Sequence, residues 1–413
     1  MSQPRPTLRT GPVGGMGTGA ALPVVLALLS VFAPLGTNAY LPALSEIGGA
    51  FGVDLPRIQL SVAVFLLGLG LGQFCGAPAS DRHGRRPTAL AGTAIAAAST
   101  VGILLCRSAD QFIALRLAQG FGGGVAVVNI GAVVGDLFDT PGAARMLSVV
   151  GLVQAVARLA APFVGAALLA AFGWRSIFGA LLAYCAFLGL LLWLKLPETV
   201  PPAGRAGRPS IVRSAIRGYG RVLGRTRALG YAACLCFSSG CLFVVVTDAA
   251  FIYMDWFGLG AGAFGGLLAL NGAAMALCTI LNVRLLDRHP AHRIVRIACG
   301  AQCLAAGALL GHVALATPSL PLVSALIAAS MGLAGVIIAN AGACFLAYFP
   351  DFRATAAGVA GSIQFVAGGV LGTALSVLHT GTLATTAIGF TLCACAAAAA
   401  LTYAKPRAGI GPA

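Results

Sequence analysis

Charge is scarce in this sequence. Asp, Glu, Lys and Arg make up 9% of its 413 residues, and only 11 residues are acidic. Soluble domains carry about 25% charged residues, whereas hydrophobic residues make up 59% of this chain and its mean hydropathy is +0.93. The shortage of charge excludes an ordinary soluble protein and places the chain in a membrane.

Several chemical signatures are missing as well. No phosphate-binding loop ending in Gly-Lys-Ser or Gly-Lys-Thr occurs, which argues against ATP hydrolysis by this chain. No nucleophile is paired with a base, so we predict that the chain is not an enzyme. The 12 cysteines are scattered through apolar stretches, where Cys behaves as a small hydrophobe. The histidines lack the spacing of metal ligands, so we expect no metal and no cofactor.

A glycine-rich run, Gly120-Phe121-Gly122-Gly123-Gly124, is present. No strand precedes it and it lies inside an apolar stretch, which is the wrong context for binding phosphate. Small residues allow membrane helices to approach one another closely. The run therefore predicts close helix packing.

The apolar stretches have the length of membrane spans. A spanning helix needs about 20 apolar residues, and twelve candidate stretches are separated by short charged or Gly- and Pro-containing breaks. Their approximate limits are residues 20–42, 57–79, 88–106, 111–135, 145–172, 175–196, 228–256, 262–286, 294–315, 319–345, 354–378 and 383–404.

One long hydrophilic segment, rich in Pro, Gly and Arg, divides these spans six and six. We therefore predict an all-α polytopic membrane protein built from two six-helix bundles. Its parts are an N-terminal tail (1–19), a first bundle (20–196), a basic linker (197–227), a second bundle (228–404) and a C-terminal tail (405–413).

The basic residues predict the orientation. With both termini in the cytoplasm, most of the 26 Lys and Arg residues fall on the cytoplasmic side, as the positive-inside rule requires. The net charge of +15 then faces anionic lipid of the inner leaflet. We accordingly expect the lipid bilayer, and no nucleic acid, as a partner.

A cluster of charged residues directly follows the second apolar stretch. Its sequence is Asp81-Arg82-His83-Gly84-Arg85-Arg86. We expect a short cytoplasmic loop in which Asp81 caps a helix or pairs with a guanidinium. A less complete version of this pattern, Asn282 to Arg288, follows the eighth stretch and suggests that the two halves are an internal repeat. The pattern Asp-Arg-x-Gly-Arg-Arg resembles the signature loop of the major facilitator superfamily, and this resemblance implies a secondary transporter whose cycle depends on Asp81, Arg82, Gly84, Arg85 and Arg86.

Further motifs narrow the resemblance. They are Thr37-Asn38-Ala39-Tyr40-Leu41-Pro42, Gly72-Gln73, Arg116-Leu117-Ala118-Gln119-Gly120, Ala161-Pro162-Phe163-Val164-Gly165, Gly173-Trp174-Arg175 and Leu196-Pro197-Glu198-Thr199. Their order resembles the Bcr/CflA branch of drug-exporting facilitators. The resemblance implies a monomeric proton antiporter of the bacterial inner membrane that exports small molecules, with Pro162 and Gly165 as a hinge in the fifth span.

Three positions of this chain differ from the residues that are usual in the Bcr/CflA branch. Asn38 stands where the branch usually has a proton-coupling aspartate, Arg158 replaces a usual proline, and Asp248 replaces a usual glycine. A charge within the bilayer costs about 2.5 to 3.5 kcal/mol on insertion scales, so it normally faces an aqueous cavity or a partner. Both new charges are therefore candidates for function, against the alternative of a static ion pair or a snorkelling side chain.

Helix rise places Asp248 and Arg116 at similar depths, in the outer part of the seventh and fourth spans. We predict that they meet across the cavity and couple protons to substrate. Arg158 is expected near the midplane, where a cation favours an anionic or carbonyl-rich substrate.

Other polar side chains fall on spans that line the cavity in the family. The full predicted set is Asn38, Tyr40, Gln73, Asn129, Gln154, Arg158, Asn271, Asn340 and Gln364. The alternative for each polar side chain is a hydrogen bond to a neighbouring helix.

The leading functional hypothesis is proton-coupled export of small amphipathic molecules by alternating access. The alternative is a dedicated exporter of one endogenous polar metabolite, such as a hydroxamate siderophore. A non-transporting receptor is a remote alternative, because the chain has no soluble domain that passes on a signal.

Overall fold

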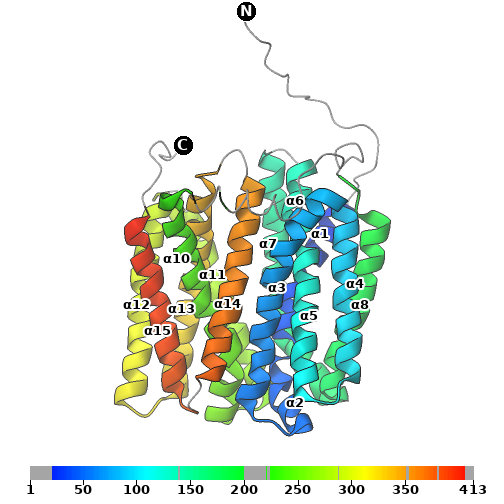
Figure 1. The fold of residues 1–413 in the computed structure, drawn as a ribbon. Helices are drawn as coiled ribbons and strands as arrows, with labels where there is room; N and C mark the ends of the chain where they lie inside the picture. Colours follow the sequence, from blue (N-terminus) through cyan, green and yellow to red (C-terminus); the bar gives the residue numbers. More distant parts are fainter. Residues whose placement is uncertain are drawn as a thin grey trace, which may run out of the picture.

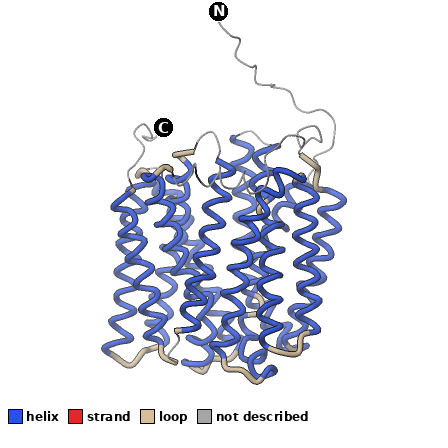
Figure 2. Tube along the Cα trace, viewed as in Figure 1, coloured by secondary structure: helices blue, strands red, loops and turns tan. Residues whose placement is uncertain are grey.

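The structure is a computed structural model that describes residues 21–137, 140–199, 220, 224–286, 288–349, 353–378 and 381–404. Helix accounts for nearly all of these residues (Figure 2). Twelve helical segments are long and apolar enough to cross a membrane, which confirms the predicted number of spans. The predicted tails and most of the predicted linker lie outside the described residues.

The first half contains six spans built from eight α-helices and one short 3₁₀ helix. The elements are α1 (Ala21–Asn38), η1 (Leu41–Ala43), α2 (Leu44–Phe51), α3 (Leu55–His83), α4 (Arg85–Leu105), α5 (Ala109–Val127), α6 (Asn129–Leu137), α7 (Thr140–Phe172) and α8 (Trp174–Lys195). The first span continues through η1 and α2 to Phe51 and is longer than predicted, whereas the fourth continues through α6 to Val134, close to its predicted limits.

The second half contains the other six spans. Its elements are α10 (Thr226–Ala250), η3 (Phe251–Trp256), α11 (Ala261–Leu286), α12 (Ala291–Leu315), α13 (Leu320–Leu346), α14 (Arg353–Val377) and α15 (Leu383–Tyr403). The element η3 is a π-helix that extends α10 without a break. This wider helical turn had no counterpart in the sequence-based prediction.

The helices form two groups that meet along a central seam (Figure 1). Within the first group α3, α4 and α5 pack together, and within the second α10 packs against α13, α14 and α15. Across the seam α3 packs against α14, and α7 packs against α11. We call the end at which α3 meets α4 the Asp81 end and the opposite end, which carries α2, the α2 end.

Glycine permits the closest helix contacts. A Cβ atom on Gly120 of α5 would lie 2.1 Å from the carbonyl oxygen of Phe65 in α3, and one on Gly124 would lie 2.1 Å from that of Leu69. A methyl group does not fit at such a distance, so these backbones touch only because glycine has no side chain. The glycine-rich run of α5 therefore serves close packing, as predicted.

The contact between the halves depends on glycine in the same way. A Cβ on Gly70 of α3 would lie 2.6 Å from the backbone nitrogen of Val366 in α14, and one on Gly369 would lie 2.6 Å from the backbone nitrogen of Leu67. The two helices thus approach backbone to backbone across the seam.

The hydrophobic core differs between the two ends. At the α2 end one cluster of buried side chains joins both halves and includes Tyr40, Phe178, Phe251 and Phe264. At the Asp81 end each half has a separate cluster. The halves are therefore held together by apolar side chains mainly at the α2 end.

Gly165 of α7 offers a direct test of this packing. A Cβ there would lie 1.7 Å from the carbonyl oxygen of Ala39, whereas a Cβ on Gly151 of the same helix would meet nothing within 4 Å. Gly165→Ala should lower the free energy of unfolding by about 1 to 3 kcal/mol or more, the usual cost of overpacking. Gly151→Ala is the matched control and should leave stability unchanged or raise it, since alanine favours helix. Thermal unfolding of the purified proteins measures both, and equal midpoints would contradict the contact.

Candidate functional site

The predicted Asp81 loop is shorter than expected. Asp81 and His83 belong to the last turn of α3 and Arg85 begins α4, so Gly84 alone lies between the helices. Gly84 has φ 108° and ψ 160°, a conformation that favours glycine. The expectation of a six-residue loop was wrong because the charged residues continue both helices.

Arg85 is the centre of a polar network at this end. Its side chain donates to Asp81 at 2.5 Å, to Asp136 of α6 at 3.0 Å and to Ser80 at 3.0 Å. The Arg85 side chain is largely buried, with 10% of its surface exposed. This confirms the predicted pairing of Asp81 with a guanidinium.

The network extends to the end of α8. The backbone nitrogen of Arg85 donates to Glu198 at 3.0 Å, the side chain of Arg86 donates to the carbonyl of Trp193, and Thr199 donates to Asp136 at 2.5 Å. These bonds join α3, α4, α6 and the chain after α8, all within the first half. Arg82 is exposed and forms none of the hydrogen bonds or ion pairs found within the described chain.

Asn129 also belongs to this network. It is fully buried, its side-chain oxygen accepts from Ser80 at 2.6 Å, and its nitrogen donates to the carbonyls of Val125 and Ala126. The second half has a comparable pair, since Asn340 of α13 donates to Asn282 of α11 at 2.6 Å. Both pairs join the second and fourth spans of a half near the Asp81 end, which supports the internal repeat inferred from the Asn282 segment.

Arg116 lies in an aromatic box inside the first half. Its guanidinium is 4.1 Å from the ring centre of Phe65 and 4.2 Å from that of Tyr40, with Phe178 at 5.9 Å. It donates to the carbonyl of Gly36 at 2.7 Å and to the side chain of Gln119. The side chain is 0% exposed, so the ring faces and neutral oxygens compensate much of the cost of burying the cation.

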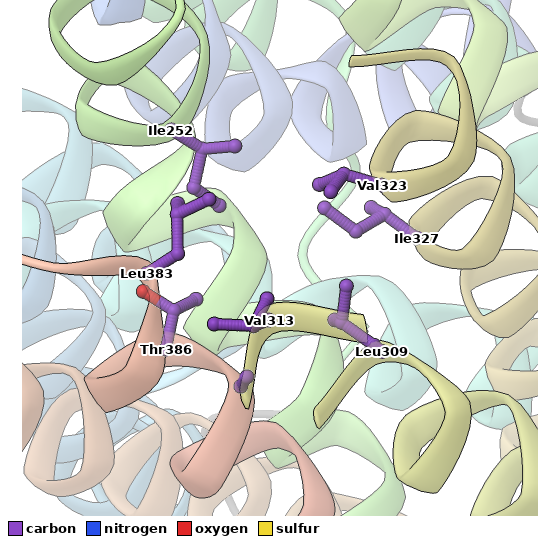
Figure 3. Close-up of a pocket in the computed structure, with 8 residues that line it drawn as sticks. Ile252, Leu309, Val313, Val323, Ile327, Leu383 and Thr386 are labelled. Carbon is purple, nitrogen blue, oxygen red and sulfur yellow. The ribbon is translucent and has the colours of Figure 1, made fainter. Parts of the chain in front are cut away.

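Asp248 is buried on the other side of the seam. Its carboxylate accepts a hydrogen bond from Thr386 of α15, and 1% of the residue is exposed. Thr386 also lines a small pocket in the second half, whose other walls include Ile252, Leu309 and Val323 (Figure 3). Figure 3 shows the oxygen of Thr386 among otherwise apolar labelled side chains. This small pocket has room for about one water molecule.

The structure does not pair Arg116 with Asp248. The ion pairs within the described residues join Arg57 to Asp110 and Arg85 to Asp81 and Asp136. The Arg116 side chain points into the first half, and the Asp248 carboxylate is hydrogen-bonded to Thr386 of α15. Their similar depth therefore did not bring them together. The predicted contact across a cavity was wrong because depth along a helix does not fix the direction of a side chain about its axis.

Arg158 lies at the contact between the halves. Its guanidinium is 3.8 Å from the sulfur of Met275 in α11, a weak acceptor. Its neighbour Leu159 lies 3.6 Å from the Cβ position of Gly272. Within the described chain no carboxylate forms an ion pair with Arg158. The predicted midplane arginine therefore faces the opposite half with little polar compensation.

The other predicted residues have varied surroundings. Gln73 lies against Gly361 across the seam, with its oxygen 2.9 Å from a Cβ position there. Gln154 donates to the Ser30 carbonyl at 3.3 Å, Gln364 donates to Ser239 at 2.6 Å, and Tyr40 bonds Ser61 at 3.0 Å, each within its own half. Asn38 is the half-buried last residue of α1, Asn271 is buried in α11, and Pro162 lies within the unbroken helix α7.

Several partners were missed from the sequence. Gln119 stands three residues after Arg116 and so lies on the same helix face, a signal that was available. The roles of Ser80, Asp136 and Thr386 depend on contacts between distant helices, which hydropathy does not reveal.

Comparison with known proteins identifies the family. Residues 26–373 match the Major Facilitator Superfamily. The chain belongs to this superfamily. It is therefore a multi-pass membrane transporter with the facilitator fold, and not an enzyme.

Relatives of this facilitator agree with the branch inferred from the motifs. It is 29% identical to the bicyclomycin resistance protein homolog of Haemophilus influenzae over 92% of this chain and 94% of the relative. It is also 29% identical to a chloramphenicol resistance protein of Pseudomonas aeruginosa, over 70% of this chain and 68% of that protein. The resemblance to the Bcr/CflA branch is thus confirmed.

A solved D-xylose-proton symporter has the same fold as this facilitator. The TM-score is 0.72 at 16% sequence identity, and the match covers 93% of this chain and 96% of the symporter. At this identity the similarity concerns the fold alone.

The polar network gives a prediction for this facilitator. Arg85→Ala leaves Asp81, Asp136 and Ser80 without their shared donor, which should lower the free energy of unfolding by about 1 to 3 kcal/mol and slow transport while the protein still inserts. Lys195→Ala removes an exposed cation from the last turn of α8 at the same end and should behave as wild type. Unfolding midpoints and transport rates in proteoliposomes measure both effects. Equal behaviour of the two variants would show that the network has no such role.

Proposed function

We propose that this protein exports small amphipathic molecules, including drug-like compounds, across the bacterial inner membrane in exchange for protons. The observation that carries the proposal is the similarity over nearly the whole chain to a bicyclomycin resistance protein homolog. The similarity to a chloramphenicol resistance protein adds a second antibiotic to the expected substrate class.

The arrangement of the halves is compatible with alternating access. By the positive-inside rule, the arginine-rich connections favour a cytoplasmic position for the Asp81 end, and we propose the same side for both termini. The halves have separate cores there and share one core at the α2 end. The α2 end then faces outward, and the shared apolar core holds the two halves together on that side.

Asp248 is our candidate for the coupling proton. Asn38 does not titrate, whereas Asp248 is a buried carboxylate within a membrane span, bonded to Thr386 beside a pocket that has room for about one water molecule. The charged form of a carboxylate buried within a membrane span is energetically unfavourable. Its protonation therefore responds strongly to any change in nearby water or charge. Arg116 is held inside the first half, so we propose that it affects coupling through the position of its helix and not through an ion pair to Asp248.

Replacing Asp248 tests the proton coupling. Asp248→Asn keeps the shape and a hydrogen-bond acceptor for Thr386 but removes the proton, so uphill export driven by a pH gradient should fall to background while downhill exchange persists. Asp255→Asn is the matched control, since Asp255 is exposed in the same segment, and it should retain uphill export. Transport in proteoliposomes with and without an imposed pH gradient measures this. Uphill export by Asp248→Asn at the wild-type rate would remove Asp248 from the mechanism.

Arg158 is our candidate for substrate selection. Its guanidinium faces the opposite half, and within the described residues its polar contact is the thioether of Met275. A poorly solvated cation gains most from a substrate that brings negative charge or strong acceptor oxygens. The same reasoning favours the second candidate function, export of one endogenous polar metabolite, over a broad preference for cationic drugs.

Substitution of Arg158 separates these substrates. Arg158→Ala should reduce transport of a carboxylate or hydroxamate compound by about tenfold or more, the loss expected when one charge-assisted hydrogen bond of about 1.5 to 3 kcal/mol is removed. Export of a cationic dye should be unchanged or increased, and Arg158→Lys, which keeps the charge, should preserve part of the selectivity. Equal losses for both compounds in Arg158→Ala would mean that the residue acts only on the structure.

A further inference from the structure

Four arginines gather at the Asp81 end of the second half, and we call this set the arginine corner. Arg284 lies in the last turn of α11, Arg288 lies in the turn that follows, and Arg293 and Arg296 lie in the first two turns of α12. All four are exposed. Residues 284–296 contain these four arginines and one carboxylate, Asp287, which lies outside the described residues. Four positive charges and one negative charge leave the segment at +3 by sequence, with histidine counted as neutral.

The two halves differ in how their cations are paired at this end. Among the described residues every ion pair lies in the first half, where Arg85 is paired with both Asp81 and Asp136. The described carboxylates of the second half are Asp248 and Asp255, which lie in α10 and η3 toward the α2 end. The arginine corner is therefore a region of positive charge that is suited to an anion from outside the chain.

The two arginines of α12 lie on the lipid-facing side of that helix. Figure 1 shows α12 at the outer edge of the second group, where it packs against α13 and α15. Its buried residues include Ile294, Val295, Ala298, Cys299, Gln302, Ala306 and Leu309. Its exposed residues recur every three or four positions, which is the spacing of a single helix face. They include Arg293, Arg296, Ile297, Gly300, Leu304 and Gly307, and we call this set the exposed stripe of α12.

The rest of the exposed stripe suits an acyl chain. Ile297 is 69% exposed and Leu304 is 77% exposed. A Cβ atom on Gly300 or on Gly307 would meet nothing within 4 Å. The stripe therefore alternates large apolar side chains with bare backbone, and it continues directly from the arginines toward the α2 end.

The arginines themselves suit a phosphate group. Residues three positions apart are neighbours on a helix surface, so Arg293 and Arg296 can reach the same anion. A guanidinium binds phosphate through two parallel N–H donors. Its long apolar stem lies along the helix while the charged end extends to the level of the headgroups.

We propose that Arg293 and Arg296, supported by Arg284 and Arg288, bind the headgroup phosphate of an anionic phospholipid whose acyl chain lies along the exposed stripe of α12. Charge identifies the occupant, because a positive corner beside an apolar stripe is complementary to a molecule with a negative head and an apolar tail. A zwitterionic phospholipid has the same tail but no net charge, so it gains less from the corner. The site concerns neither the exported molecule nor the coupling proton, and it therefore goes beyond the proposed function.

Lipid binding to the purified full chain tests the site. Native mass spectrometry in detergent, with dioleoylphosphatidylglycerol or dioleoylphosphatidylcholine added, gives the Kd of the first bound lipid. We expect phosphatidylglycerol to bind more tightly than phosphatidylcholine. Each arginine near the headgroups contributes about a fivefold preference for an anionic lipid. The double variant Arg293→Gln with Arg296→Gln should therefore raise the Kd for phosphatidylglycerol about twentyfold and leave that for phosphatidylcholine unchanged.

A double variant at the opposite end provides a control of equal charge. Arg107→Gln with Arg175→Gln removes two exposed arginines at the α2 end and should leave the Kd for phosphatidylglycerol unchanged. Arg293→Lys with Arg296→Lys keeps the charge and should retain most of the preference. All three double variants should match the wild-type Tm in phosphatidylcholine, because substitutions of exposed side chains change stability little.

Three results would overturn the site. The first is an equal Kd for the two lipids in the wild type, and the second is a wild-type Kd for phosphatidylglycerol in the glutamine variant of α12. The third is an equal loss in the variant at the α2 end, which would show an effect of net charge and not of position. If the glutamine variant of α12 unfolds more easily, Arg284→Gln with Arg288→Gln replaces it, and an unchanged Kd in that variant would overturn the site in the same way.

Discussion

The close approach of α3 to α5 and α14 is the constraint on which the rest of this structure depends. Glycines at both contacts let backbone touch backbone, at Gly120 and Gly124 within the first half and at Gly70 and Gly369 across the seam. Because lipid tails are as apolar as the side chains, tight packing provides much of the attraction between membrane helices. The position of α3 in turn places Ser80 and Asp81 beside Arg85, and Phe65 beside Arg116.

Polar chemistry in this protein is divided among separate places. Arg85 and its carboxylates lie at the Asp81 end, Arg116 lies in the first half, Asp248 lies in the second, and Arg158 lies at the seam between them. In the described chain these centres share no ion pair. The proposed coupling between them therefore depends on movement of the helices that carry them.

Much of the fold could be predicted because hydropathy along the chain determines where spans lie. The Asp81 pair and the role of the Gly120 run also followed from local sequence. The surroundings of Arg116, Asn129 and Asp248 did not, because a polar residue in a span can face a cavity or a neighbouring helix at the same depth. The rotation of each helix decides between these, and it is set by contacts such as Phe65 with Arg116 or Thr386 with Asp248. The π-helix at Tyr253 has no sequence signature of its own.

The shared core at the α2 end makes the two ways of opening energetically unequal. Separating the halves there brings buried side chains such as Phe251, Tyr253 and Phe264 into contact with water, at about 25 cal/mol for each Å² of apolar surface. At the Asp81 end the cores are already separate, so opening there wets less apolar surface. A ligand that favours separation of the halves at the α2 end must supply this difference through tighter binding to the separated state. The aromatic side chains of the shared core therefore favour the arrangement in which the two halves stay together at the α2 end.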